Sequence, residues 1–313
     1  MSRLSVSRLA NLSLEDAPLA GLTGYSYTQA VALEQAGIDY ILVGDSGGMV
    51  ELGFPSTRSV LMSDMLRMAE SVRRGAPHTF LVGDMPLGSY EPSDAEAVRS
   101  AIDFVRFAGV DAVKLEGGSR VESRVRAIAN AGIAVIGHIG VTPQSPVNLT
   151  GYRVHGKIAS EFSALVEDAR ALFTAGASAI LLEAIPHHVS AQLNRLVSGT
   201  FLGIGAGRGL AGQLLILHDV LGQYPDFRPK FAKNYGREIM EAIVSNSVLL
   251  ANVENEFISQ VVKSETPMLE FMKACIRQYI LEVRSGEFPS EEFEYPISDT
   301  DLQALESSAV WQI

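Results

Sequence analysis

The sequence predicts a parallel (β/α)8 barrel, because short apolar segments alternate with amphipathic segments from about residue 18 to residue 220. The segments with the character of strands are PLAGLT, IDYILVG, TFLVG, DAVKLE, IAVIGH, SAILLE, FLGIG and LLILH. Most are rich in leucine or β-branched residues and lack a polar alternation, which is typical of strands buried on both faces. A doubly wound open sheet is the alternative that the same alternation allows.

The segments between these strands have helical character. Helices are predicted over Tyr27–Gln35, Ser63–Arg73, Pro92–Phe107, Arg120–Asn130 and Glu161–Thr174. Four of them end in Ala-Gly, within AGI (36–38), AGV (108–110), AGI (131–133) and AGA (175–177). A glycine just past a helix adopts the left-handed conformation at little cost, and the next strand begins at once. The repetition indicates successive βα units.

From about residue 237 the pattern is mainly helical, with long amphipathic segments up to about residue 285. We interpret residues 1–313 as a single (β/α)8 barrel domain, of which about 237–313 form a helical C-terminal extension. This extension is expected to pack on the barrel or on a neighbouring subunit. The acidic tail EEFEYPISDTDLQ is expected to lie at the surface.

Composition limits the classes of function. The 313 residues are 47% hydrophobic and 19% charged, which suits a compact α/β enzyme. A net charge of −11 without a basic block argues against nucleic-acid binding. The one cysteine, Cys275, excludes an internal disulfide and fits a reducing compartment. No apolar run reaches the roughly 18 residues of a membrane span, and the N-terminus lacks a signal-peptide core, so a cytoplasmic location is expected.

Carboxylates close three consecutive predicted strands: Asp45, Asp84 and Glu116. One such residue is weak support for a site, because aspartate is common in turns and as a helix cap. In a barrel, however, the carboxyl ends of the strands meet at one mouth, where three carboxylates would repel one another unless one took a proton. A divalent cation removes this repulsion. Mg2+ suits a few carboxylates supplemented by substrate and water oxygens.

Three further polar residues lie at or near strand ends. Lys114 precedes Glu116 by two positions, so both side chains lie on the same side of the strand. It is a candidate for neutralising a substrate oxyanion, or for a salt bridge to a nearby carboxylate. His138 either orients or polarises a carbonyl or is a satisfied core residue. Glu183 follows four apolar residues, which should raise its pKa and suit a general base.

These residue types indicate a reaction class. A divalent ion with a lysine and a partly desolvated glutamate fits proton abstraction next to a carbonyl, with the metal holding the enolate oxygen. A 2-oxo acid would chelate the ion through its carboxylate and keto oxygens, and its enolate could then form or break a carbon–carbon bond. GIGAG (203–207) is expected to let the backbone approach a ligand closely, but it is not a dinucleotide fingerprint. His187 and His188 are expected in a solvated loop rather than in a second metal site.

Several motifs carry a family resemblance that runs from about residue 20 to residue 295. They are VGDSGGM, SVRRGAPH, GDMP, VKLEGG, GHIGVTPQS, GYRVHGK, LLEAIP, GIGAG, GQLLILHD, PKFAKNY and IRQYILEVRSGEFP. In this order they resemble ketopantoate hydroxymethyltransferase. The resemblance implies a (β/α)8 barrel of the phosphoenolpyruvate/pyruvate superfamily. It also implies an Mg2+-dependent transfer of a hydroxymethyl group from 5,10-methylenetetrahydrofolate to 3-methyl-2-oxobutanoate, an early step towards pantothenate, and a homo-oligomer, often a decamer.

The resemblance also assigns roles to individual residues. Asp45, Asp84 and Glu116 match the magnesium site. Ser46 and Lys114 match substrate-binding positions. Asp45 and Asp84 are expected to contact the substrate as well as the metal ion. Glu183 matches the proton acceptor, and His138 matches a histidine that lines the pocket. The expected catalytic group is therefore Glu183, Lys114 and His138.

The chain departs from the family pattern at several positions. Ser26, Phe54, Pro55 and Ala211 replace the usual polar or acidic residues, and about thirty residues are inserted around 241–270. We therefore expect enolate chemistry to be retained, while the 2-oxo acid or the one-carbon donor differs. Two alternatives remain open at this point. One is a folate-independent lyase or aldolase with the same magnesium enolate, and the other is a metabolite-binding paralogue without turnover.

Overall fold

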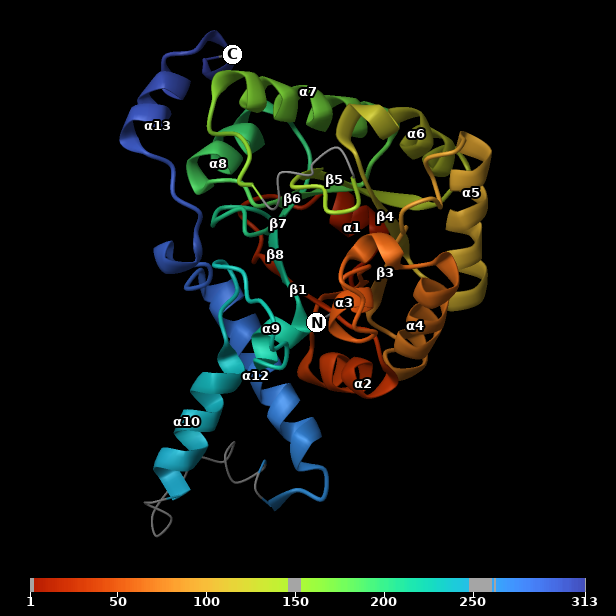
Figure 1. The fold of residues 1–313 in the computed structure, drawn as a ribbon, viewed down its shortest axis with the longest axis vertical. Coiled ribbons are helices and arrows are strands. Elements are labelled where there is room, and N and C mark those ends of the chain that lie inside the picture. The colour runs from red at the N-terminus through yellow and green to blue at the C-terminus, as the bar shows by residue number, and fades with distance from the viewer. Residues whose placement is uncertain (1–2, 146–152, 248–260, 262, 313) are drawn as a thin grey trace.

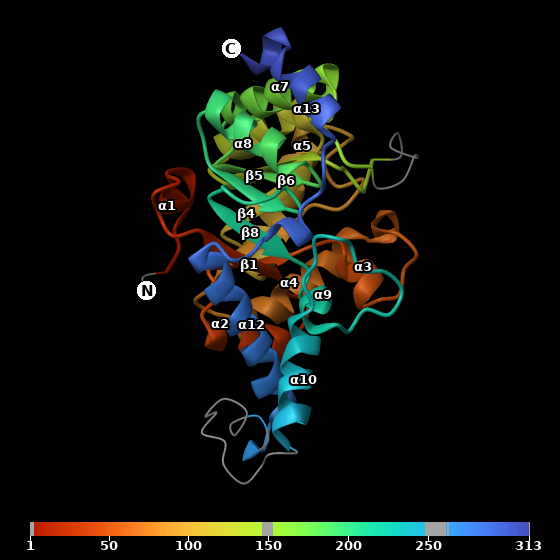
Figure 2. The ribbon, with the colours of Figure 1, turned by 90° about the vertical axis from the view of Figure 1, so that its left-hand side faces the viewer.

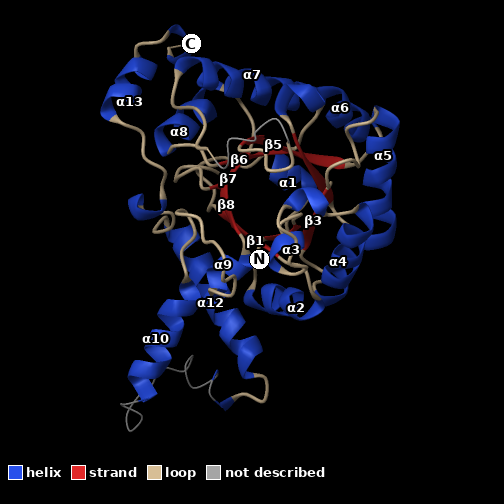
Figure 3. Cartoon of the chain, in the orientation of Figure 1, coloured by secondary structure: helices blue, strands red, loops and turns tan. Residues whose placement is uncertain are grey.

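Eight parallel strands close into a barrel in chain order, and β1 pairs with β8 to complete it. The computed structural model describes residues 3–145, 153–247, 261 and 263–312. The strands form a ring at the centre of the molecule, and helices surround it (Figures 1 and 3). The predicted (β/α)8 barrel is therefore confirmed, and the open sheet is excluded. The strands are β1 Leu19–Thr23, β2 Tyr40–Val43, β3 Phe80–Asp84, β4 Ala112–Glu116, β5 Ala134–Gly140, β6 Ala179–Glu183, β7 Phe201–Ile204 and β8 Gly212–Leu215.

Helices follow the strands and cover their outer side. The longer helices are α2 Tyr27–Ala36, α4 Met62–Gly75, α5 Asp94–Asp103, α6 Glu122–Asn130, α7 Ala159–Ala175, α8 His187–Leu196, α10 Tyr235–Ser247, α12 Pro267–Ser285 and α13 Asp299–Glu306. The shorter ones are α1 Val6–Ala10, α3 Gly47–Val50, η1 Thr57–Ser59, η2 Phe104–Ala108, η3 Gly118–Val121, α9 Leu217–Leu221, η5 Glu291–Phe293 and η6 Ala309–Trp311. Within the described ranges, none of the helices combines the length and apolar character that a bilayer crossing needs.

Left-handed glycines end the barrel helices as the Ala-Gly repeats predict. Gly37, Gly109, Gly132 and Gly176 have φ angles of 85°, 60°, 83° and 103°. Only glycine adopts this region without strain, and it allows the chain to turn from the helix directly into the next strand. The repeats therefore mark the βα units correctly.

The last strand differs from its predicted position. LLILH (214–218) was expected to be the strand, but β8 is Gly212–Leu215 and α9 begins at Leu217. The Leu217 amide donates a hydrogen bond to Thr23 Oγ1 at 3.0 Å, which fixes the first turn of α9 against the end of β1. His218 and Asp219 therefore belong to a buried helical turn rather than to a strand end.

The C-terminal helices both complete the barrel layer and extend beyond it. α12 packs on α2 and β1, and the Tyr279 hydroxyl donates to the Gly21 carbonyl at 3.0 Å. α10 packs against α12, and the two helices project together from one side of the barrel (Figures 1 and 2). Of the insertion predicted around 241–270, residues 248–260 and 262 lie outside the described residues, as do the first two residues of GYRVHGK.

The acidic tail does not lie wholly at the surface. Glu294 is buried and accepts hydrogen bonds from the Arg208 amide at 3.1 Å and from Arg208 Nε at 3.0 Å. Lys230 Nζ donates to the Glu294 carbonyl at 2.7 Å. These contacts hold the tail against the loops that follow β7 and β8. The surface prediction is therefore wrong at Glu294, because the guanidinium of the partly exposed Arg208 compensates the buried carboxylate.

Candidate active site

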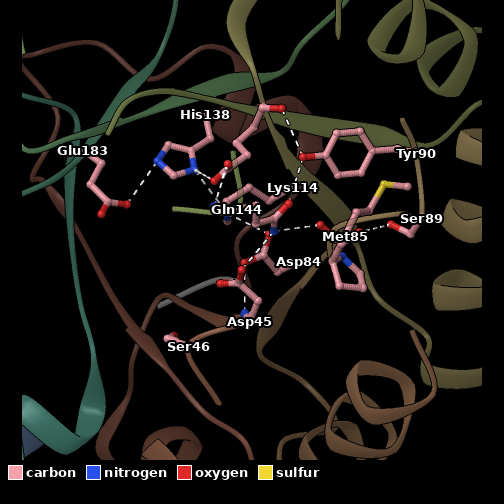
Figure 4. Close-up of polar contacts among 12 residues, drawn as sticks. Asp45, Ser46, Asp84, Met85, Ser89, Tyr90, Lys114, His138, Gln144 and Glu183 are labelled. Carbon is pink, nitrogen blue, oxygen red and sulfur yellow. Dashed lines mark hydrogen bonds and ion pairs between the residues drawn. The ribbon is translucent and has the colours of Figure 1, made fainter. Parts of the chain in front are cut away.

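The strand register brings the candidate residues to one cavity at the carboxyl ends of the strands. Asp84 on β3 lies beside Lys114 on β4, and Glu116 on β4 lies beside His138 on β5. Figure 4 shows the side chains of Asp84, Lys114 and His138 converging. The cavity is lined by all seven residues singled out from the sequence, namely Asp45, Ser46, Asp84, Lys114, Glu116, His138 and Glu183.

Lys114 is buried at the centre of this group. Its Nζ lies 2.8 Å from Asp84 Oδ1 and 3.3 Å from His138 Nδ1. Burial lowers the pKa of Lys114, but the charges of Asp84, Asp45 and Glu116 outweigh burial and raise it above its ordinary value. The side chain is therefore a charged ammonium, and its ion-pair partner is an aspartate rather than Glu116.

His138 connects Lys114 to Glu183. Its Nε2 lies 3.1 Å from Glu183 Oε2, and its Nδ1 lies 3.3 Å from Lys114 Nζ (Figure 4). Burial and the Lys114 charge lower the pKa of His138, against the opposing effect of Glu183. The imidazole is therefore neutral at pH 7. An ammonium can only donate, so Nδ1 accepts from Lys114 and the ring proton lies on Nε2, where it faces Glu183.

The carboxylates are held by amide donors. The Asp45 amide donates to Asp84 Oδ2 at 3.1 Å, and Gln144 Nε2 donates to Asp45 Oδ2 at 3.0 Å. Glu116 Oε1 accepts from the amides of Gln144 and Ser145 at 2.9 and 3.1 Å. Burial nevertheless raises the pKa of Asp84 to about 7 and that of Glu116 to about 9. The cavity is therefore short of positive charge.

This donor set suits a hard divalent cation. Among the described residues, no three histidine, cysteine or acidic side chains already surround a point in metal-binding geometry. The three carboxylates of Asp45, Asp84 and Glu116, however, share the single ammonium of Lys114. Mg2+ prefers oxygen ligands and negative charge, so the chemistry of Asp45, Asp84 and Glu116 suits this ion.

Sequence reasoning missed Gln144 and Tyr25. Gln144 joins three parts of the site, because Nε2 also donates to the Met85 carbonyl at 3.0 Å and Oε1 accepts from the Tyr90 hydroxyl at 2.9 Å. The Tyr25 and Ser46 hydroxyls are 2.9 Å apart, which orients Ser46 in the cavity. Gln144 lies in GHIGVTPQS, whereas Tyr25 lies two residues beyond the first predicted strand, PLAGLT, so only Gln144 belonged to a recognised motif.

The glycines near Asp45 and in GIGAG make room for protein side chains. A Cβ at Gly47 would lie 2.6 Å from Tyr25 Cδ1, and one at Gly48 would lie 2.2 Å from Val60 Cγ2. A Cβ at Gly205 would lie 2.4 Å from the Phe231 ring. At Gly205 the missing side chain therefore leaves room for Phe231.

His187 and His188 begin α8 rather than lying in a loop. The His187 Nδ1 lies 3.0 Å from the Arg208 carbonyl. The prediction of a loop is therefore wrong, because both residues are helical. His187 is half-buried and His188 is exposed.

A second wall of the cavity comes from the chain after β8 and from the tail. It contains Ile216, Asp219, Tyr224, Phe227, Pro229, Phe231 and Tyr295. Asp219 is 4% exposed, and its Oδ2 has no hydrogen-bond partner among the described residues. Burial raises the pKa of Asp219 to about 7, against the charges of His218 and Arg228. None of these residues was predicted to belong to the site.

Comparison with known proteins places this geometry in a family. The model of ketopantoate hydroxymethyltransferase matches residues 3–248. The chain belongs to this family. A 3-methyl-2-oxobutanoate hydroxymethyltransferase of Alkaliphilus metalliredigens is 40% identical over 296 residues, which cover 95% of this chain and 94% of the relative. One of Ignicoccus hospitalis is 44% identical over 273 residues, which cover 86% and 90%. Because the members of this family are hydroxymethyltransferases, the chain is a one-carbon transferase.

Solved structures show the same fold at low sequence identity. A phosphonopyruvate hydrolase is 13% identical, with a TM-score of 0.56 and coverage of 91% of this chain and 99% of that one. An oxaloacetate acetylhydrolase is 14% identical, with a TM-score of 0.53 and coverage of 92% and 97%. A 2,3-dimethylmalate lyase described as a PEP mutase/isocitrate lyase superfamily member has a TM-score of 0.51. These structures share the barrel fold that the sequence predicts.

The departures from the ketopantoate hydroxymethyltransferase pattern lie away from the cavity. The described residues that line the cavity do not include Ser26, Phe54, Pro55 or Ala211. Ser26 caps α2, and Phe54 packs against the hydrophobic core. Ala211 makes backbone hydrogen bonds with Phe201 and Leu19 at the opposite end of the barrel strands. These substitutions therefore give no reason to expect a different acceptor or donor.

We predict that Asp219→Asn stabilises the protein at pH 8 and loses this advantage near pH 4. Because the folded state raises the pKa of Asp219 from 3.8 to about 7, the native protein holds a proton that the unfolded chain releases over that range, so stability falls as pH rises. The neighbouring charged or titratable groups are His218, Arg228, Tyr25 and Tyr224. The cost is about 1.4 kcal/mol for each pKa unit, measurable by urea unfolding at both pH values. If Asp219→Asn were less stable than the wild type at pH 8, this prediction would be wrong.

Proposed function

We propose that this protein transfers the one-carbon unit of 5,10-methylenetetrahydrofolate to C3 of 3-methyl-2-oxobutanoate, with Mg2+ in the site. Water supplies the hydroxyl of the new hydroxymethyl group, and the products are 2-dehydropantoate and tetrahydrofolate. Family membership and the relatives named 3-methyl-2-oxobutanoate hydroxymethyltransferase support the acceptor and the reaction. The observation that carries the proposal is the chain of contacts from Asp84 through Lys114 and His138 to Glu183 inside one cavity. A lyase or a non-catalytic paralogue is less well supported, because the family is one of hydroxymethyltransferases.

Asp45, Asp84 and Glu116 would hold the magnesium ion. When bound, the ion supplies charge stabilisation for the keto oxygen that becomes the enolate oxygen. Lys114 provides a fixed ammonium beside the same carboxylates, so it can stabilise a substrate oxygen from a second direction. Ser46 presents its hydroxyl to the cavity, held by Tyr25, and can donate to the substrate carboxylate.

Glu183 is the proposed base for the C3 proton. Its side chain is 17% exposed at the cavity, so a substrate can reach it. The His138 N–H on Nε2 faces one carboxylate oxygen and leaves the other for the proton that is removed. The same carboxyl can then hold the proton while C3 attacks the one-carbon unit.

Exchange of the C3 proton in deuterated buffer tests the base directly. Glu183→Gln should retain 2-oxo acid binding while the exchange rate falls by about 10²–10⁴-fold, because the amide cannot accept the proton. Proton NMR of 3-methyl-2-oxobutanoate follows the reaction without any folate. The matched control is Glu287→Gln, an exposed residue just beyond α12, which should exchange like the wild type. Exchange at the wild-type rate in Glu183→Gln would remove Glu183 from this role.

We also expect Mg2+ binding to release protons and to weaken as the pH falls from 8 to 6. Burial raises the pKa of Asp84 to about 7 and of Glu116 to about 9, so the metal-free site carries protons that a cation must displace. Isothermal titration in buffers of different ionisation enthalpy measures the released protons.

Asp84→Asn should remove most of this Mg2+ affinity, whereas Asp103→Asn, on the outer helix α5, should not change it. An Mg2+ affinity that is equal at pH 6 and pH 8 would contradict the assignment of these carboxylates.

A further inference from the structure

The cavity has two chemically different walls. The charged residues come from the ends of β2 to β6, whereas the opposite side comes from the segment after β8 and from the tail. We name the second group the aromatic wall and define it as Tyr224, Phe227, Phe231 and Tyr295. Phe227 lines the cavity and is 58% exposed, so part of this wall is open to solvent.

The aromatic wall is held in place by specific contacts. Phe231 and Tyr295 meet edge to face, with ring centroids 6.0 Å apart. Glu294, the residue before Tyr295, accepts hydrogen bonds from Arg208 and fixes the tail to the loop between β7 and β8. Lys230, next to Phe231, donates to the Glu294 carbonyl. The segments that carry Phe231 and Tyr295 are therefore hydrogen-bonded to each other. Such fixed segments are what a preformed binding surface requires.

Asp219 is the buried acid of this wall. It is 4% exposed, lines the cavity, and has an oxygen, Oδ2, without a hydrogen-bond partner among the described residues. Leaving a buried acceptor unpaired costs free energy, so a residue of this kind needs an explanation outside the folded chain. Its electrostatic neighbours are Tyr25, Tyr224, His218 and Arg228.

We propose that Asp219 and the aromatic wall bind the planar heteroaromatic ring of the one-carbon donor, with Asp219 accepting hydrogen bonds from its aminopyrimidine edge. The inference rests on the proposed function, because that function supplies a reduced pterin as donor. An aminopyrimidine presents two neighbouring N–H groups, and a carboxyl group is the side chain that accepts both. Aromatic side chains provide the matching surface for a flat ring.

Other ligands fit this wall less well. A metal ion would need several ligand groups, and the described residues that line this side of the cavity offer one carboxylate, that of Asp219. A simple ammonium ion would be repelled by Arg228, whose charge acts on Asp219. A neutral ring with N–H donors is compatible with both the arginine and the unpaired oxygen.

The aromatic wall also reaches the proposed base. Tyr295 lies close enough to Glu183 that the carboxylate, together with burial, raises the pKa of the phenol. Both residues line the same cavity. A ring lying on this wall would therefore bring its one-carbon unit towards C3 of a 2-oxo acid held opposite Glu183, as transfer requires.

A cycle of ligand and protein changes tests the contact with Asp219. Calorimetry would measure the binding of tetrahydrofolate and of its 2-desamino analogue to the full-length wild type and to Asp219→Asn. Wild type should bind tetrahydrofolate at least about tenfold more tightly than the analogue, the range for a charge-assisted hydrogen bond. In Asp219→Asn this ratio should fall to about two or below. If Asp219 had a purely structural role, the substitution would weaken the binding of both ligands equally. The ratio of the two affinities would then be unchanged.

The outcomes separate this inference from the proposed function. If wild type binds tetrahydrofolate and transfers the one-carbon unit, but Asp219→Asn keeps the wild-type ratio, the Asp219 subsite is overturned and the function stands. If wild type binds no tetrahydrofolate in the presence of Mg2+ and 2-oxo acid, the folate donor itself is overturned. Urea unfolding shows that the variant is folded, and Asp103→Asn serves as the matched control, with an unchanged ratio.

Discussion

The buried ammonium of Lys114 is the interaction on which the site depends. It is the one cation among the described side chains that contacts both Asp84 and His138, at 2.8 and 3.3 Å. Its contact with Asp84 reduces the repulsion among the cavity carboxylates, and its donation to His138 determines which ring nitrogen carries the proton. Without it, the pKa values of the buried Asp84 and Glu116 would rise further, and the imidazole could turn its lone pair towards Glu183.

This interaction follows from the barrel itself. Parallel register sets Asp84 beside Lys114 and Glu116 beside His138, so residues from separate strands meet without a loop having to carry them. Amide donors from the loop after β5 then fix Glu116, and Gln144 ties that loop to Asp45 and to Met85. The arrangement is electrostatically incomplete, since its carboxylates outnumber its cations. That deficit is the physical reason to expect a divalent ion.

The strands and the inward residues could be predicted because they follow simple periodic rules. Asp45, Asp84, Lys114, Glu116, His138 and Glu183 stand at or near strand ends, where barrel geometry alone brings them together. Gln144 and Tyr25 could not be assigned, because their roles depend on which groups meet them in space. The burial of Glu294 depends on Arg208, 86 positions away. Likewise Gly47 and Gly205 contact aromatic rings that no local pattern relates to them. Local periodicity thus predicts elements and their ends, whereas loop and tail packing requires the folded chain.

The protonation of His138 tests the central claim most directly. Nitrogen-15 NMR of histidine-labelled protein, with the His138 signals identified by their loss in His138→Gln, reports the charge and tautomer of the ring. At pH 7 the account predicts a neutral imidazole with its proton on Nε2 and an unprotonated Nδ1 that accepts from Lys114. A proton on Nδ1, or an imidazolium at pH 7, would contradict it.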